Sequence, residues 1–503
     1  MNTNHAFAID RISSSFIKQN KKKVKNKYIV LYNAIKECIV KVELPHQWVL
    51  PATRTLAIEM DLSRTTVVKA YELLSLEKLI IPKIGSGYHV NFVQEKSSDS
   101  DKNKNTTFDT VLYPEISEKG QAFLKNSTLL NRESNKGIAF RPGLPPLDIF
   151  PVNQWKNLLN TYWRHVKSSG LSNAPSSGLN PLKVNICNYL NISRNIKCEP
   201  DQLLIVSGSL QSLYLISSAL LNKGDAIILE NPTFPNVHSI FKSSQANLLP
   251  VALDAEGISI DSINKYNSLQ PKLVHVTPSN QYPLGTKMTL KRRKELISWA
   301  SENKALIIEN DYENEVGNFD GAIPSIFSLD TEDRTIYLGT FNRLLHPTIR
   351  LGYMIVPKYL IKTIEAIQEH SHKFVAPSIQ MVMSQFIEKN YLYQHLKNIN
   401  TVAQERQNLF ISYFNTNTTK MFIEKMPYAS LHVIAKFREE VTSKQEITIL
   451  NALLEANIVA HSLSNCYIGD EKQMGFILGY SSVRPTVIKQ KVLQMTDLLN
   501  KNY

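Results

Sequence analysis

No part of this sequence is apolar for long enough to cross a membrane. A transmembrane helix needs about 18 or more consecutive apolar residues, and none of the 503 residues lies in such a run. The sequence also lacks the short apolar core, flanked by charges and a small-residue cleavage site, that marks a secretory signal peptide. These absences argue against a membrane protein, and we expect a cytoplasmic protein without a membrane partner.

Cysteine is scarce and widely spaced. The four cysteines, Cys38, Cys187, Cys198 and Cys466, form no Cys-x-x-Cys pair and no cluster with histidine. Disulfide frameworks and structural zinc sites both need such clusters. We therefore predict no metal site and expect buried, reduced thiols.

Positive charge, by contrast, is abundant near the N-terminus. The chain has a formal net charge of +13, and residues 1–93 hold 14 Lys and Arg against 7 Asp and Glu, about half of the excess. A basic module of this kind is typical of proteins that bind a polyanion. The run Lys18–Lys27 supplies much of the charge. Two interpretations of it stay open: a solvated leader, or an arm that contacts phosphates.

Three helices are predicted after this run. Apolar residues recur at helical spacing over Tyr28–Val40. A second, short helix is expected over Thr53–Met60, capped by Thr53, and Asp61-Leu62 then reads as a tight turn. The third helix is expected to begin at Ser63, whose hydroxyl can cap its first turn, and to bury Val67, Ala70, Tyr71 and Leu74.

A β-hairpin is predicted next. Leu79–Pro82 and Tyr88–Phe92 alternate like strands, and Gly85-Ser-Gly87 between them supplies a glycine-rich tip. Three helices followed by such a hairpin indicate a winged helix-turn-helix.

These residues closely resemble the GntR family of bacterial regulators. Leu50–Ala57, Leu62–Leu74 and Gly85–Gly87 match that family's motif in order and spacing. The resemblance implies a module that binds double-stranded DNA. Short hydroxyl and long basic side chains at the exposed start of the third helix suit a major groove. A winged helix that binds protein is the alternative. The DNA contacts that the resemblance implies are Arg54, Ser63, Arg64, Thr65 and Thr66, with Lys69 on a phosphate and Gly85 in the wing.

The segment 94–136 changes in character. Ser97–Thr107 is polar and poor in apolar residues, which predicts a flexible linker, and a short helix is expected over Ile116–Leu124. The chain is long enough for two or three domains. We predict a basic leader over 1–27, a winged helix over 28–93, a linker over 94–136 and a second domain over 137–503.

The second domain is predicted to be α/β. Strand-like runs alternate there with helical stretches, which favours a mainly parallel sheet covered by helices on both faces. The runs are Gln202–Val206, Ala226–Leu229, Leu273–Val276 and Ala305–Ile308. The last hundred residues indicate a smaller α+β part, with strands at Ala429–Ala435 and Gly475–Tyr480.

The stretch Tyr337–Tyr353 resembles the pyridoxal-phosphate signature of fold-type I aminotransferases, and the likeness extends over nearly the whole second domain. With the winged helix, the chain is similar to the MocR subfamily of GntR regulators, in which an aminotransferase-like domain senses a ligand. The resemblance implies a homodimer on an operator with paired half-sites, a small-molecule effector and, as the family's cofactor, pyridoxal phosphate.

One residue departs from that pattern decisively. Arg343 stands where the family has the lysine that forms an imine with the cofactor. An imine needs a neutral primary amine, whereas a guanidinium stays protonated. We therefore predict no catalytic residue, no covalent cofactor and no enzymatic activity.

The other cofactor contacts are carried over by resemblance. Ser209, at a strand-to-helix junction, can also cradle an anion with the helix amides. Asn310 replaces the aspartate that keeps the pyridine nitrogen protonated, and Asp311 should face the other side of its strand. Core packing is the alternative for these positions. The residues predicted at the site are Ser209, Thr340 and Arg350 for phosphate, Phe234 for stacking, and Asn310, Tyr312 and Arg343 around the ring.

Three functions remain open. The first is a DNA-binding transcription regulator with a degenerate aminotransferase-like sensor domain. The second is such a regulator that still binds pyridoxal phosphate, without a covalent link. The third is an active aminotransferase with an accessory DNA-binding domain.

Overall fold

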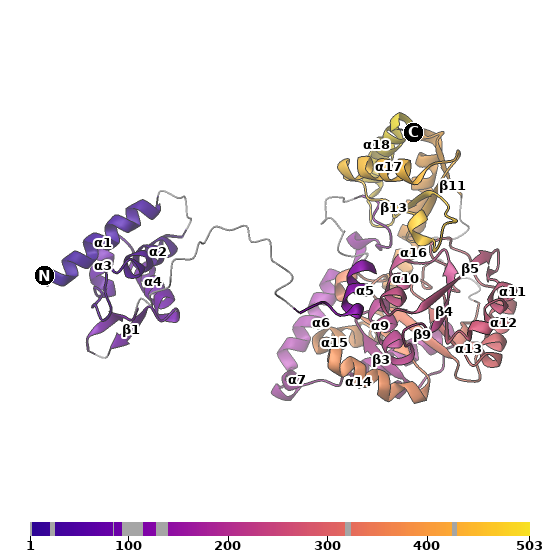
Figure 1. Cartoon of the computed structure of the whole chain (residues 1–503), viewed down its shortest axis with the longest axis horizontal. Coiled ribbons are helices and arrows are strands. Elements are labelled where there is room, and N and C mark those ends of the chain that lie inside the picture. The colour runs from indigo at the N-terminus through magenta and orange to yellow at the C-terminus, as the bar shows by residue number, and fades with distance from the viewer. Residues whose placement is uncertain are drawn as a thin grey trace. The chain divides into compact units, whose positions relative to one another are not determined.

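The structure, a computed structural model, describes residues 3–20, 26–83, 85–92, 114–126, 139–316, 323–424 and 430–502. The chain divides into two compact units, 1–113 and 114–503, which are coloured by residue number in Figure 1. The predicted linker Ser97–Thr107, the domain start at 137 and residues 21–25 of the basic run lie outside the described residues.

Unit 1 contains the predicted three helices and hairpin, and one further helix. The hairpin strands pair antiparallel, with Ile80 opposite Val90 and Lys83 opposite Gly87. The predicted buried face of the third helix is confirmed, because Val67, Ala70, Tyr71 and Leu74 are all buried. The elements are α1 Thr3–Asn20, α2 Lys27–Val40, α3 Thr53–Glu59, α4 Arg64–Leu76, β1 Ile80–Lys83 and β2 Gly87–Val90.

The two predicted N-caps have different outcomes. Ser63 caps α4 as predicted, since its Oγ accepts a hydrogen bond from the amide of Thr66. The prediction that Thr53 caps α3 is wrong. The extended residue before α3 is Ala52, with φ −59° and ψ 143°, so Thr53 is already the first helical residue and its hydroxyl cannot take the cap position.

Helix α1 was not foreseen, since its residues were assigned to a basic leader. Ala8 and Ile12, one helical turn apart, are fully buried in the same core as α2 and α4. Ser15 and Gln19 donate hydrogen bonds to Glu37 of α2 at 2.8 and 3.0 Å. The predicted boundary between residues 27 and 28 therefore separates helix α1 from the core to which it belongs. The charged run at the end of the predicted leader drew attention away from the apolar residues of α1.

Unit 2 is built on a large mixed sheet. The prediction of a mainly parallel sheet is confirmed. The order is β3-β10-β9-β8-β7-β4-β5-β6; the strands from β9 through β5 are parallel neighbours, and β10 is antiparallel to both β3 and β9. The strands are β3 Leu203–Val206, β4 Ala226–Asn231, β5 Asn247–Asp254, β6 Gly257–Ile258, β7 Leu273–Val276, β8 Leu306–Asn310, β9 Thr335–Thr340 and β10 Gly352–Ile355.

Helices cover both faces of this sheet. In β3, Leu203 and Ile205 pack in one core with α8 and α15, whereas Leu204 and Val206 pack in another with α9 and α14. The short helix predicted near Ile116 is confirmed as α5. The helices are α5 Glu118–Asn126, α6 Val152–His165, α7 Ser168–Ser172, α8 Asn180–Arg194, α9 Ser209–Leu220, α10 Pro235–Ser243, α11 Ile260–Asn264, α12 Leu290–Glu302, α13 Ile326–Leu329, α14 Ile361–Ser371 and α15 Pro377–Glu388.

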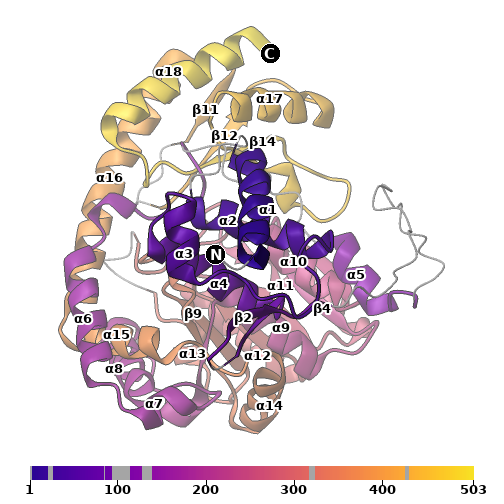
Figure 2. The same cartoon turned by 90° about the vertical axis from the view of Figure 1, so that its left-hand side faces the viewer.

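The C-terminal part is the predicted smaller α+β layer. Its antiparallel sheet has the order β11-β12-β14-β13, and the long helix α16 lies beside α18 (Figure 2). The elements are α16 Tyr391–Asn417, β11 Met421–Ile423, β12 Val433–Phe437, α17 Ser443–Glu455, β13 His461–Ser462, β14 Gly475–Leu478 and α18 Pro485–Asn502. Within the described ranges, no helix has the length and apolarity that a membrane span requires.

Candidate functional site

The predicted DNA contacts lie on the surface of unit 1. All are exposed except Thr66, which is half-buried. Most of them stand at the N-terminal end of α4, which the core fixes through its opposite face: Tyr71 is fully buried and donates a hydrogen bond to the carbonyl of Pro51, ahead of α3, at 2.8 Å. The side chains that the sequence singled out are thus held on a rigid helix end.

The hydroxyls at this helix end differ from the two arginines, Arg64 at the start of α4 and Arg54 in α3, in whether they already have hydrogen-bond partners. Ser63 Oγ lies 2.9 Å from Thr65 Oγ1 and 2.8 Å from Thr66 Oγ1, so the three hydroxyls already bond to one another. The side chains of Arg54 and Arg64 form no hydrogen bond or ion pair within the described part of the chain. Both guanidiniums keep all their donors available for a partner.

The hairpin tip requires glycine for its backbone conformation. Gly85 has φ +77°, and a Cβ placed there would meet no atom within 4 Å. The glycine therefore serves the left-handed turn itself, since nothing crowds the position.

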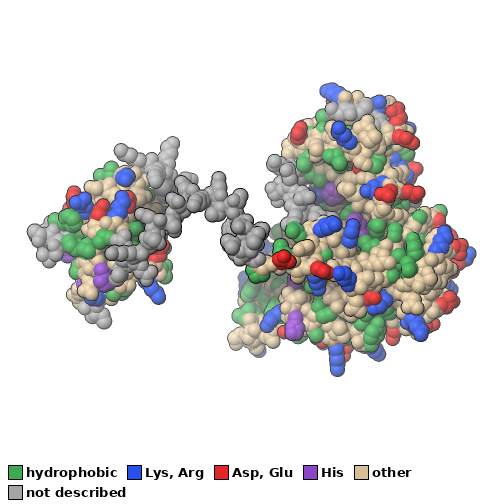
Figure 3. Space-filling view, in the orientation of Figure 1, with side chains coloured by type: hydrophobic (Ala, Val, Ile, Leu, Met, Phe, Trp, Pro, Cys, Tyr) green, Lys and Arg blue, Asp and Glu red, His purple; other side chains and the backbone are tan. Residues whose placement is uncertain are grey.

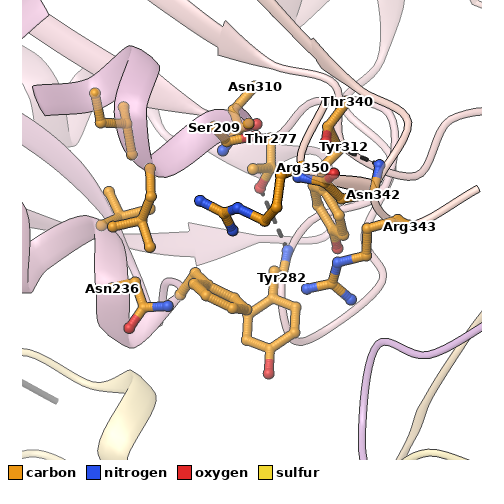
Figure 4. A pocket seen from close by; sticks show the side chains of 15 residues that line it. Ser209, Asn236, Thr277, Tyr282, Asn310, Tyr312, Thr340, Asn342, Arg343 and Arg350 are labelled. Atoms are coloured by element: carbon orange, nitrogen blue, oxygen red, sulfur yellow. Dashed lines mark hydrogen bonds between the residues drawn. The ribbon is translucent and has the colours of Figure 1, made fainter. Parts of the chain in front are cut away.

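All seven residues that were predicted to surround a cofactor line one cavity of unit 2, which has a volume of about 190 Å³. They converge because of the sheet topology: Asn310 and Thr340 end β8 and β9, Ser209 follows β3, and Phe234 follows β4. Carboxyl ends of parallel strands meet at one edge, where α/β proteins bind ligands. Figure 4 shows the side chains around this cavity.

One end of the cavity is suited to an anion. Ser209 is the first residue of α9, and Gly208 before it has φ +133°, where a side chain would also clash with the amide of Asn342. Arg350 donates to Ser207 Oγ at 3.4 Å. The N-terminus of α9, the hydroxyls of Ser209 and Thr340 and the guanidinium of Arg350 therefore line this end of the cavity, and these are groups that bind phosphate.

The middle of the cavity contains polar atoms without partners. Asn310 Nδ2 lies 3.3 Å from Nε2 of His275, whose complete burial lowers its pKa to about 3 and keeps it neutral. Asn310 Oδ1 and the hydroxyl of Tyr312 are buried and have no hydrogen-bond partner among the described residues. Buried polar groups are rarely left unpaired, so this arrangement fits a ligand that carries polar groups of its own.

Asp311 faces away from the cavity, as predicted. Its carboxylate forms an ion pair with Arg194 at 2.6 Å and accepts a hydrogen bond from the hydroxyl of Tyr337 at 2.7 Å. All three side chains are buried. Asp311 therefore cannot replace the missing aspartate at position 310.

Arg343 is held inside the cavity by aromatic rings and a carboxylate. Its Cζ lies 5.6 Å from the ring centroid of Phe234 and 5.1 Å from that of Tyr312, which are cation–π distances. Its Nη1 lies 3.8 Å from Glu313, whose other oxygen accepts a hydrogen bond from the amide of Leu431 at 2.6 Å. No lysine is found among the described residues that line the cavity.

Sequence reasoning missed Thr277, Tyr282 and Asn342. Tyr282 packs edge-on against Phe234 at 4.6 Å between centroids. Thr277 donates to Glu230, and burial raises the pKa of that carboxyl to about 7. The sequence could have indicated Thr277, because it directly follows β7 at the same sheet edge.

On the face shown in Figure 3, acidic and basic side chains are interspersed over unit 2.

Comparisons with known proteins agree with this architecture. Residues 147–474 match the family model "Aminotransferase class I and II". The chain is 31% identical to the uncharacterized HTH-type transcriptional regulator YdeL of Bacillus subtilis (strain 168), over 76% of this chain and 77% of that protein. It is 26% identical to the probable rhizopine catabolism regulatory protein MocR of Rhizobium meliloti, over 92% of this chain and 91% of that protein.

Among solved structures, the α-aminoadipate aminotransferase LysN of Thermus thermophilus superposes with a TM-score of 0.70. The match covers 77% of this chain and 97% of that chain at 19% identity. At this identity the likeness shows the fold alone, and it confirms the predicted fold-type I architecture.

Proposed function

The chain belongs to the MocR subfamily of GntR-type transcription regulators, and we propose that it binds double-stranded DNA through unit 1 and a phosphate-bearing small molecule through unit 2, without catalysing a reaction. The observation that carries the proposal is that Arg343, and no lysine, lies in the cavity among its described lining residues. The cavity keeps an anion cup and stacking aromatics but has this guanidinium where catalysis would need an amine.

On the DNA side, the N-terminal end of α4 enters a major groove. Arg64 reads a base edge there, since its guanidinium is exposed and unpaired within the described residues. Arg54 and Lys69 contact phosphates and position the helix. Two copies of the chain place two such helices on paired half-sites.

On the ligand side, the residues present fit pyridoxal phosphate as a non-covalent ligand. Ser209, Thr340 and Arg350 would hold the phosphate, and Phe234 would pack on the ring. When bound, this molecule supplies an aldehyde and an electron-accepting pyridine ring. Arg343 cannot bond to the aldehyde, and the neutral amide of Asn310 cannot stabilise a charge on the ring nitrogen.

An aldehyde-free analogue tests this half of the proposal. Wild-type protein should bind pyridoxal phosphate and pyridoxine 5′-phosphate with similar Kd in a calorimetric titration, because neither forms a bond to the chain. Pyridoxal, which lacks the phosphate, and the Arg350→Ala variant should both bind much more weakly. A large preference for the aldehyde over the alcohol would contradict non-covalent binding.

An active aminotransferase is the competing function, and its test is direct. It requires a primary amine in the cavity to hold the cofactor. Transfer of amino groups from any of a panel of amino donors by the purified wild-type chain would establish this alternative, and we expect none.

A further inference from the structure

Two of the scattered cysteines meet in the folded chain. Cys187 lies in α8, and Cys198 lies in the turn that leads from α8 toward β3. Asn195 ends α8 in the left-handed conformation, at φ 53°, and this reverses the chain. The two Sγ atoms come within 3.3 Å of each other. The two thiols are therefore neighbours in the fold, although they are not adjacent in the sequence.

The surroundings favour the thiolate of Cys187. The thiol of Cys198 donates its hydrogen bond to Cys187 Sγ, and this bond is the main reason that the pKa of Cys187 is lowered. Burial and the charge of Glu199 oppose that shift, and the positive charge of Lys183 adds to it. Lys183 is only 6% exposed and lies one helical turn before Cys187. A cysteine beside a lysine is a better nucleophile at neutral pH because more of it is ionised.

The pair lies beside a cavity at the surface. Both residues line this cavity, which has a volume of about 260 Å³. Cys187 is buried, at 9% exposure, whereas Cys198 is half-buried, which corrects the expectation that all four cysteines are buried. Cys38 and Cys466 are buried, and burial raises the pKa of each to about 12. They serve as internal controls.

We propose that Cys187 and Cys198 form a redox-active site at which a small hydroperoxide, such as hydrogen peroxide, produces a reversible disulfide within one chain. With hydrogen peroxide, the Cys187 thiolate attacks one oxygen, the O–O bond breaks, and the hydroxide that leaves takes up a proton to become water, which makes Cys187 a sulfenic acid. Cys198 then attacks that sulfur, an S–S bond forms, the S–O bond breaks, and a second water leaves. Two thiols lose two electrons and two protons, and the peroxide is reduced to water.

The geometry requires only a small movement. The sulfurs must approach by about 1.3 Å to reach the length of a disulfide bond. Cys198 lies in the short connection after α8, so the approach does not have to displace a strand of the sheet. The proposal is independent of what unit 2 binds.

The test uses full-length protein. Reduced wild type is titrated with hydrogen peroxide, its free thiols are counted, and its peptides are mapped by mass spectrometry. We expect the count to fall from four to two, a peptide pair joined through 187 and 198, and full recovery with dithiothreitol. The Cys466→Ser variant, which leaves the pair intact, should lose the same two thiols, and Cys198→Ser should form no bridge. Lys183→Met should slow the oxidation several-fold.

Other outcomes would overturn the proposal. These are oxidation of Cys187 beyond sulfenic acid while Cys198 stays a free thiol, bridges between two copies of the chain, and equal reactivity of all four cysteines. Alkylation of reduced wild type needs no variant and gives an independent check. Cys187, whose pKa is lowered by the hydrogen bond from Cys198, should be labelled faster than Cys38 and Cys466, whose pKa values burial raises, and the reverse order would refute the site.

Discussion

Replacing Arg64 by alanine should weaken DNA binding without weakening the fold. Arg64 is exposed at the first position of α4 and makes no hydrogen bond or ion pair within the described residues, so its loss removes no internal contact. An arginine that pairs with a base contributes about 1–3 kcal/mol of discrimination. That corresponds to a roughly 5- to 160-fold rise in Kd for the specific site.

Fluorescence anisotropy at fixed salt, with DNA from the chain's own upstream region and a scrambled duplex of equal length, measures this effect. Arg64→Ala should lose affinity for the specific duplex far more than for the scrambled one. Lys41→Ala is the matched control, because it removes the same charge from an exposed residue whose ion pair is with Glu37. The control should keep the ratio between the two duplexes.

Arg54→Ala distinguishes base recognition from contacts with the phosphate backbone. A phosphate contact carries no sequence information, so its loss should weaken both duplexes alike and reduce the salt dependence of binding. If Arg64→Ala binds both duplexes as wild type does, or if its losses on the two duplexes are equal, then α4 does not read the sequence through this residue.

Three further outcomes are expected. Ser63→Ala should lower the stability of unit 1 by about 1 kcal/mol, since it removes the cap of α4, and Ser63→Asp should restore it; unchanged melting in both variants would show that the cap contributes nothing. Glu230→Gln should weaken a pH dependence: the folded carboxyl keeps its proton up to a pKa of about 7 against an ordinary 4.5, so wild-type stability should fall as pH rises through that window. The variant's stability should fall less steeply rather than stay level, since Glu315, whose pKa burial also raises to about 7, still contributes there; parallel melting curves would argue against it. Limited proteolysis should cut first near Ser97–Thr107 and leave a stable fragment of unit 2; a first cut within 200–350 would show a misplaced boundary.

Sequence patterns predicted the elements best where burial is regular. The buried face of α4 follows from helical spacing. The four strand runs of the large sheet follow from short continuous apolar stretches, because nearly all their residues are buried. Helix α1 was missed because its residues were included in a leader defined by the basic run that begins at Lys18. Its apolar spacing was overlooked, since Ala8 and Ile12 are buried and Ile9 and Phe16 pack against the same core. The cap at Thr53 failed because the cap position depends on backbone angles, which shifted it by one residue.

The candidate site likewise contains some residues that the sequence predicted and others that it did not. Residues carried over from a known motif lie together, since the order of the strands brings their ends to one edge. Contacts that arise only from folding were not foreseen. Tyr282 reaches the cavity from a loop after β7, and Cys187 meets Cys198 because α8 ends in a left-handed turn. Neither pairing has a spacing that a sequence pattern would reveal.

Borohydride reduction of the full-length protein in the presence of pyridoxal phosphate tests the central claim most directly. A lysine that forms an imine with the cofactor is trapped as a stable adduct, whereas a guanidinium is not. Peptide mapping of wild type should find no pyridoxyl group on any residue of the cavity, and Arg343→Lys, assayed in parallel, should acquire one at position 343. A reducible adduct within the cavity of the wild-type chain, accompanied by amino-group transfer, would contradict the account of a regulator that binds its ligand without chemistry.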